Sequence, residues 1–161
     1  MRTRIILVFP GMGRSTFHKN NLDTTLDLDS SEWSWALTKN GAKRNPEFPQ
    51  NYIKHIKSNI GKYEFIFVSS HAEVRKALLD NCIFFYWVCP LYNRKQEFID
   101  RYIEKGNEDA FVKLLDDKWD DWIEEFYFYK PEIGYKAILS GFDYLSDELN
   151  FIIKIENEEK I

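Results

Sequence analysis

The chain has 161 residues and a formal net charge of −4, so it is long enough for one compact domain with a hydrophobic core. The negative charge argues against nucleic acid as a partner, because nucleic-acid-binding proteins present basic surfaces to the phosphate backbone. Aromatic residues make up 17% of the chain and supply large buried areas, as well as surfaces on which nucleobases can stack.

The start of the chain and the cysteines indicate the compartment. The apolar start, Met1 to Phe9, is too short for a signal peptide, and no apolar run of the sequence is as long as a membrane span. Cys82 and Cys89 flank an apolar segment without the spacing of a metal site, which favours reduced core cysteines. We therefore expect a cytoplasmic protein with no membrane partner.

A glycine loop follows the first apolar segment. The run Ile5–Phe9 is continuously apolar, as expected of a central parallel strand. Gly11 and Gly13 then allow a sharp turn and a close approach to a ligand. Ser15 and Thr16 follow where a helix start would offer free N–H groups and a hydroxyl. This pattern is typical of a phosphate-binding P-loop, and the alternative is an ordinary strand–turn–helix.

The loop departs from the usual P-loop pattern of Gly, four residues, Gly, Lys and Ser or Thr. Gly13 and Ser15 match the end of that pattern, but Arg14 replaces the lysine and Val8 occupies the position of the first glycine. Arginine keeps the positive charge but presents a planar fork instead of a compact ammonium group. The residues that we assign to nucleotide binding are Gly11, Met12, Gly13, Arg14, Ser15 and Thr16.

Two carboxylates follow the second predicted strand, Thr24–Leu28. In an α/β sheet ligands bind beyond the carboxyl ends of the strands, so Asp27 and Asp29 are candidate site residues. One carboxylate would hold a magnesium-bound water, and the other would orient or deprotonate an acceptor. The alternative is a helix cap and turn cluster, which Asp and Ser readily form.

The segment from about 32 to 62 is predicted to be an acceptor-binding insertion. It contains Trp33 and Trp35 in a polar setting, followed by the basic Lys43 and Arg44. We expect Trp35 to stack on a base and Arg44 to hold an acceptor phosphate. The alternatives are packing for the tryptophans and solvated surface charge for the basic residues.

The third and fourth predicted strands are Glu64–Ser70 and Cys82–Pro90. In many P-loop proteins the third strand ends in an aspartate that helps to hold magnesium, whereas this one ends in two serines. The metal role would therefore shift to Asp27 or Asp29. His71 follows the third strand, and we expect it to act as a cap or hydrogen-bonding residue rather than as a catalyst.

The helices at about 93–126 are predicted to form a lid. Arg94, Arg101 and Lys105 lie on one helical face, where they would close over transferring phosphates. The alternative is a solvated amphipathic face, whose basic residues could pair with Glu97, Asp100 and Glu104 on the flanking faces.

The remaining elements complete an α/β pattern. A helix is predicted over Asp109–Phe126, with its aromatic and aliphatic residues in the core and a solvated acidic face. A fifth strand is predicted over Tyr135–Leu139. Strands that alternate with helices favour a five-stranded parallel sheet in a three-layer sandwich.

Three elements carry a resemblance to a known family: Pro10–Thr16, Asp27–Asp29 and the pair Arg94/Arg101. Together they resemble the nucleoside-monophosphate kinase-like branch of P-loop proteins, which includes shikimate- and gluconate-type kinases. The resemblance implies a P-loop NTPase fold over residues 1–161, with the strand order 2-3-1-4-5 and with ATP and Mg²⁺ as cofactors. It also implies that Ser15 and Asp27 hold the metal.

The chain is also similar to small kinase-like proteins encoded by tailed phages of Gram-positive bacteria, around Arg44–Pro49 and Ser69–His71. That similarity implies a location in the host cytoplasm, and it brings no assigned substrate with it.

The leading hypothesis is phosphoryl transfer from ATP to a small acceptor, which we take to be a (deoxy)nucleoside monophosphate. The residues assigned to catalysis are Arg14, Asp29, Arg94 and Arg101, and those assigned to the acceptor are Asp29, Trp35 and Arg44. The alternative is a nucleotide-binding regulatory or interaction protein with a degenerate P-loop and little catalysis. The sequence leaves open whether the protein forms a homodimer or binds a protein partner.

Overall fold

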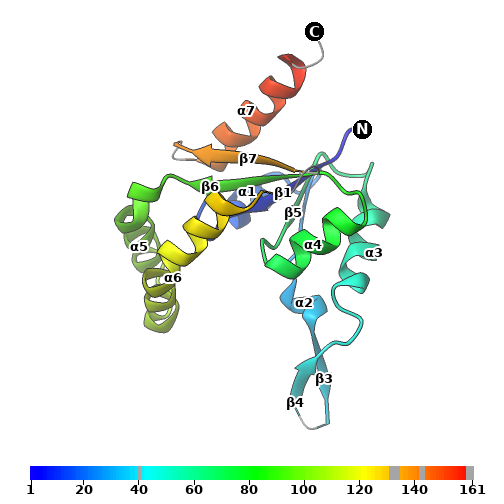
Figure 1. Ribbon diagram of the computed structural model, residues 1–161, viewed down its shortest axis with the longest axis horizontal. Helices are drawn as coiled ribbons and strands as arrows, with labels where there is room; N and C mark the ends of the chain where they lie inside the picture. Colours follow the sequence, from blue (N-terminus) through cyan, green and yellow to red (C-terminus); the bar gives the residue numbers. More distant parts are fainter. Residues whose placement is uncertain (40, 131–134, 142–143, 159–161) are drawn as a thin grey trace. The chain divides into compact units, whose positions relative to one another are not determined.

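The computed structural model describes residues 1–39, 41–130, 135–141 and 144–158, with the backbone alone for 135–140 (Figure 1). Two compact units make up the chain. The first contains Met1–Val8, Arg14–Trp87 and Ile133–Lys136, and the second contains Phe9–Gly13, Val88–Glu132 and Ala137–Ile161. None of the described helices is long and apolar enough to cross a membrane.

Four strands form a parallel sheet in the order β2-β5-β1-β6. They are β1 (Arg4–Val8), β2 (Thr25–Asp27), β5 (Phe65–Val68) and β6 (Phe85–Pro90). Strand β5 pairs in parallel with both β1 and β2, and all its residues are buried. Continuously apolar strands of this kind are typical of parallel sheets covered on both faces. Strand β7 (Tyr135–Ser140) lies next to β6 in the strand order.

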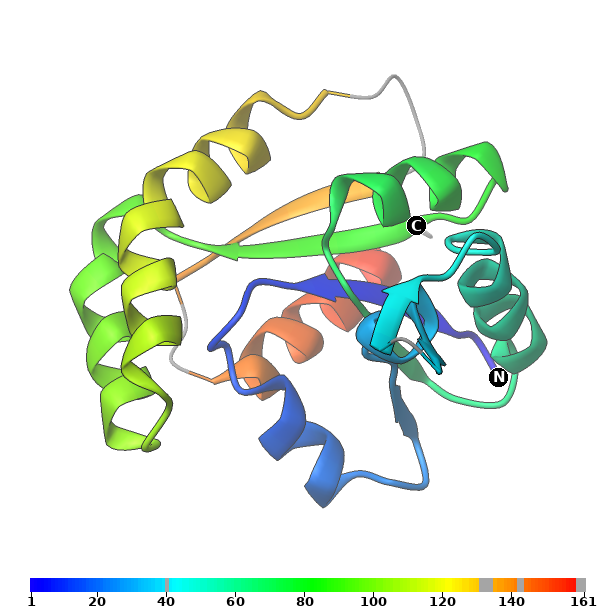
Figure 2. The ribbon, with the colours of Figure 1, turned by 90° about the horizontal axis from the view of Figure 1, so that it is seen from below.

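Helices of the first unit lie on both sides of these strands. They are α1 (Arg14–Asn20), α3 (Gln50–Asn59) and α4 (Ala72–Asp80). Phe17 of α1 contacts the rings of Phe65 and Phe67 edge-on, with centroids 6.4 and 6.0 Å away. Figure 2 shows α1 and α4 on opposite sides of β1. The predicted α/β class and parallel sheet are thus confirmed, and the arrangement fits a three-layer fold.

The segment after β2 forms a hairpin that the sequence analysis did not predict. Helix α2 (Ser31–Ser34) leads into β3 (Trp35–Thr38), which pairs antiparallel with β4 (Gly41–Arg44) in a separate sheet. The hairpin is almost wholly exposed, so it lacks the alternation of apolar and polar residues that predicts strands. The sequence Asn40-Gly41, which is common in hairpin turns, was the available signal.

The second unit contains a short 3₁₀ helix, η1 (Tyr92–Arg94), and the helices α5 (Lys95–Glu104), α6 (Asp109–Phe128) and α7 (Leu145–Glu158). Its core contains Phe9, whose ring centroid lies 5.2 Å from that of Trp119 on α6 and 6.0 Å from that of Phe98 on α5. The predicted core face of α6 is confirmed at Leu115, Trp119, Ile123 and Phe126, which are buried. Phe111 and Leu114, also predicted to be in the core, are exposed.

Candidate functional site

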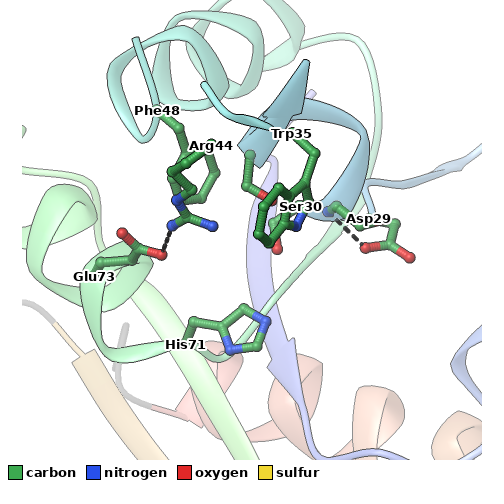
Figure 3. Close-up of a pocket in the computed structure, with 9 residues that line it drawn as sticks. Asp29, Ser30, Trp35, Arg44, Phe48, His71 and Glu73 are labelled. Atoms are coloured by element: carbon green, nitrogen blue, oxygen red, sulfur yellow. Dashed lines mark hydrogen bonds and ion pairs between the residues drawn. The ribbon is translucent and has the colours of Figure 1, made fainter. Parts of the chain in front are cut away.

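A pocket of about 290 Å³ lies within the first unit (Figure 3). Asp29 follows β2 and His71 follows β5, so the pocket lies at the carboxyl ends of two adjacent parallel strands. This is the edge of an α/β sheet where ligands bind. The residues that line the pocket are Asp29, Ser30, Ser31, Ser34, Trp35, Arg44, Phe48, His71 and Glu73.

Aromatic rings and one guanidinium group form a wall of this pocket. Trp35 and Arg44 are paired directly across the hairpin, which places their side chains on the same face. The guanidinium carbon of Arg44 lies 5.7 Å from the ring centroid of Trp35 and 4.7 Å from that of Phe48. Such contacts are favourable cation–π interactions. The wall therefore combines flat apolar surfaces, which suit a planar ring, with one positive charge.

Two carboxylates occupy the pocket together with Arg44. Arg44 forms an ion pair with Glu73 of α4, and Figure 3 shows the guanidinium directed toward that carboxylate. Both side chains are 47% exposed, so water screens the pair and a ligand can compete with it. Asp29 accepts a hydrogen bond from the Ser31 amide at 2.9 Å through Oδ1. A carboxylate has further lone pairs, so Asp29 can still accept a bond from a ligand.

The glycine loop after β1 has the backbone that its sequence predicts. Gly11 and Gly13 have φ of +86° and +87°, a left-handed conformation that favours glycine. A Cβ atom on Gly11 would lie 2.6 Å from Cε2 of Tyr102 in α5, so helix α5 packs directly on the loop. Met12 is buried, and Ser15 and Thr16 of α1 are exposed.

Arg14 and Asp27 form an ion pair within the first unit. The Arg14 Nε atom lies 3.1 Å from Asp27 Oδ1, and that oxygen is buried without a hydrogen bond of good geometry. A buried carboxylate oxygen with spare acceptor capacity fits a metal-bound water. Mg²⁺ in nucleotide sites commonly takes only one or two protein carboxylates, with phosphates and waters as its other ligands. Among the described residues no group of three or more His, Cys, Asp or Glu forms a metal cluster.

Arg94 and Arg101 converge on Glu97. Arg94 donates to both Glu97 oxygens, at 2.8 and 2.7 Å, and Arg101 donates to Oε1. The hydrogen bond from Arg94, followed by the charges of both arginines, lowers the pKa of Glu97. Both guanidinium groups also lie over the ring of Phe98, at 5.6 and 5.1 Å from its centroid. The pairing with Glu97, which was the alternative to a lid role, is therefore present.

The structure brings some predicted site residues together and adds others. Asp29, Trp35 and Arg44, which were assigned to the acceptor, line one pocket. Phe48 and Glu73 line it as well and were not predicted. His71 occupies the position before α4 without a side-chain cap bond, and it too lines the pocket. The available signal for His71 was its position after a parallel strand.

Other predicted site residues lie in separate groups. Arg14 pairs with Asp27, and Arg94 shares Glu97 with Arg101. No family model matches the chain, and no curated protein matches it. A functional conclusion therefore depends on the geometry of the pocket, the loop and the arginines.

Proposed function

We propose that the protein is an ATP-dependent phosphotransferase whose acceptor, a (deoxy)nucleoside monophosphate, binds in the pocket at the ends of β2 and β5. The observation that carries the proposal is the convergence of Asp29, Trp35 and Arg44 in that pocket. These residues come from three segments, and each type matches one part of such an acceptor. The proposal includes a P-loop NTPase fold whose sheet has the five-stranded order 2-3-1-4-5, with β7 as the fifth strand.

The acceptor uses all three groups of the pocket. Its base stacks on Trp35, which is 53% exposed and so leaves part of its ring open to a ligand. Its phosphate pairs with Arg44 and replaces Glu73 there, because a phosphate dianion attracts a guanidinium more strongly than one carboxylate does. Asp29 accepts a hydrogen bond from the acceptor and fixes its orientation.

The donor nucleotide binds at the glycine loop. The left-handed backbone at Gly11 and Gly13 supports this assignment, since backbone N–H groups in such turns form anion-binding concavities. Arg14 interacts with the β- and γ-phosphates after leaving Asp27, and Thr16 contacts the α-phosphate. Ser15 and Asp27 are the residues that would hold Mg²⁺, which neutralises phosphate charge when bound. The buried Oδ1 of Asp27 supports that role.

The reaction is an in-line displacement. A phosphate oxygen of the acceptor attacks the γ-phosphorus, the bond from that phosphorus to the β–γ bridging oxygen breaks, and ADP leaves with the bonding electrons. Arg94 and Arg101 neutralise the charge that develops on the transferred group. Their shared partner Glu97 holds the two guanidinium groups together before the nucleotide binds.

The test is ADP release from ATP and magnesium across a panel of ribo- and deoxynucleoside monophosphates, with shikimate and gluconate included. Arg44→Ala should raise the acceptor KM, by about tenfold or more, because a charge-assisted contact is lost. Lys43→Ala is the matched control, since it removes the same charge from the neighbouring residue on the opposite face of β4. Equal effects of the two variants, or release that no acceptor stimulates, would refute the proposal.

A second candidate is a nucleotide-binding regulatory or interaction protein with little turnover. The Arg14–Asp27 pair favours it, because it holds the loop arginine on a carboxylate rather than free for phosphate. This candidate predicts clear ATP binding without acceptor-dependent ADP release. Rapid turnover with any acceptor of the panel would exclude it.

A further inference from the structure

Tyr52 of α3 joins the two chain segments that follow β2 and β5. Its side chain is completely buried, and its hydroxyl donates a hydrogen bond to the Leu28 carbonyl at 2.9 Å. The same hydroxyl accepts a hydrogen bond from the Ser69 amide at 3.3 Å. Burial raises the pKa of Tyr52 to about 12, so the hydroxyl stays protonated and remains a donor at neutral pH.

Ser69 provides a second link between the same segments. Its Oγ accepts a hydrogen bond from the Ser30 amide at 3.1 Å. The backbone bond from the Leu28 amide to the Phe67 carbonyl, at 3.0 Å, lies just before these links. Beyond this backbone bond, the side chains of Tyr52 and Ser69 connect the segments that follow β2 and β5. This explains what a serine does where many P-loop proteins have a metal-binding aspartate: Ser69 acts as a structural acceptor.

Asp29 lies between the two anchored residues. The carbonyl of Leu28 is held by Tyr52, and the amide of Ser30 is held by Ser69. The backbone of Asp29 is thus fixed on both sides, and its Oδ1 is held by the Ser31 amide. We propose that Tyr52 is a positioning residue whose hydroxyl, together with Ser69, holds Asp29 in the orientation that the acceptor requires. This inference rests on the role of Asp29 in the proposed function.

The hydroxyl can be tested apart from the packing of the ring. The ring of Tyr52 lies 5.9 Å from that of Phe48 and 6.2 Å from that of Trp33, and phenylalanine would keep both contacts. Tyr52→Phe therefore removes one hydroxyl and leaves the aromatic packing in place. Tyr63→Phe is the matched control, because Tyr63 precedes β5 at its amino end, away from the pocket.

The kinetic experiment is a double-mutant cycle between Tyr52→Phe and Asp29→Asn, with the acceptor that supports turnover. We expect Tyr52→Phe to lower kcat by roughly ten- to a hundredfold and to leave the KM for ATP unchanged, because a misplaced orienting group costs about that much. In the Asp29→Asn background the same change should lower kcat by less than about twofold. An equal loss in both backgrounds, or wild-type kcat in Tyr52→Phe, would overturn the inference.

Amide hydrogen exchange gives a readout that needs no turnover. We expect Tyr52→Phe to speed exchange at Ser69 and Ser30 by about tenfold, while exchange at the buried Ile6 of β1 stays as in the wild type. If no acceptor supports turnover, the proposed function fails, and the exchange rates still decide whether Tyr52 fixes this segment. Unchanged exchange at both serines would overturn the positioning role even in an active enzyme.

Discussion

Replacing Gly11 by alanine tests how tightly α5 packs on the glycine loop. The added Cβ would lie 2.6 Å from Tyr102 Cε2 and 3.1 Å from Phe98 Cδ1. Gly13→Ala is a close control, because Gly13 has φ of +87° against +86° for Gly11, yet its Cβ would meet no atom within 4 Å. Both variants therefore carry the same free-energy cost of a left-handed backbone, and only Gly11→Ala adds a contact with α5.

The magnitudes follow from these two terms. A left-handed conformation costs a non-glycine residue about 1–2 kcal/mol. Alanine also lowers the conformational entropy of the unfolded chain relative to glycine, and this offsets about 0.4–1 kcal/mol of that cost. Gly13→Ala should thus lower the free energy of unfolding by about 1 kcal/mol. Overpacking adds about 1–3 kcal/mol, so Gly11→Ala should lower it by about 2–4 kcal/mol.

The assay is urea denaturation followed by tryptophan fluorescence, to which both units contribute. Trp119 and Trp122 supply the signal of the second unit, and both contact Phe9 next to the loop. The slope of the free energy against urea should stay constant among the variants. In a Tyr102→Ala background, Gly11→Ala should cost less than in the wild-type background, and its remaining excess over Gly13→Ala should reflect the 3.1 Å contact with Phe98 Cδ1. If Gly11→Ala and Gly13→Ala are equally destabilising in the wild-type background, the packing argument is wrong.

Three further predictions concern charged side chains. Glu73→Gln should tighten binding of a phosphate-bearing acceptor by about two- to fivefold, because Arg44 no longer has a competing carboxylate. Calorimetric titration measures this affinity. Weaker binding by the variant would mean that Glu73 contacts the acceptor itself. Glu97 has a pKa lowered from 4.5 in the folded protein, so its ionised form stabilises the fold above pH 4.5, and that contribution is lost as the pH falls further. Glu97→Gln should accordingly flatten the fall of unfolding free energy in acid, whereas Glu104→Gln on the same helix should not, and identical acid profiles of the two variants would contradict this reasoning. Arg14→Ala should weaken ATP binding by about tenfold or more in a nucleotide titration, and unchanged affinity would remove Arg14 from the donor site.

Local sequence was enough to predict the sheet strands. Phe65–Val68 is apolar at every position, and a short run of this kind can be buried only if both faces of the strand are covered. The same holds for Ile5–Val8 in β1. The sharp turn of the backbone at Gly11 and Gly13 was also predictable, because glycine adopts a left-handed φ without strain and both residues have one.

The hairpin and much of the pocket could not be predicted in this way. Strands β3 and β4 are exposed on both faces, so burial imposes no pattern on their sequence. Glu73 and Phe48 reach the pocket from segments 25 residues apart, and only tertiary packing brings them together. The ion pair between Arg14 and Asp27 could not be predicted either. The sequence places Asp27 at the end of a strand, but it does not show that this carboxylate lies next to Arg14 in space.

The charges of the pocket limit how an acceptor can bind there. Among the residues that line the pocket, Asp29 and Glu73 are acidic, and Arg44 contributes one positive charge. A phosphate dianion that enters while Glu73 holds Arg44 would meet a net negative surface. Phosphate binding therefore requires Glu73 to leave Arg44, and the exposure of both side chains makes that exchange inexpensive. Under the proposed function, the Arg44–Glu73 pair would thus make this pocket selective for acceptors that carry enough negative charge to displace a carboxylate.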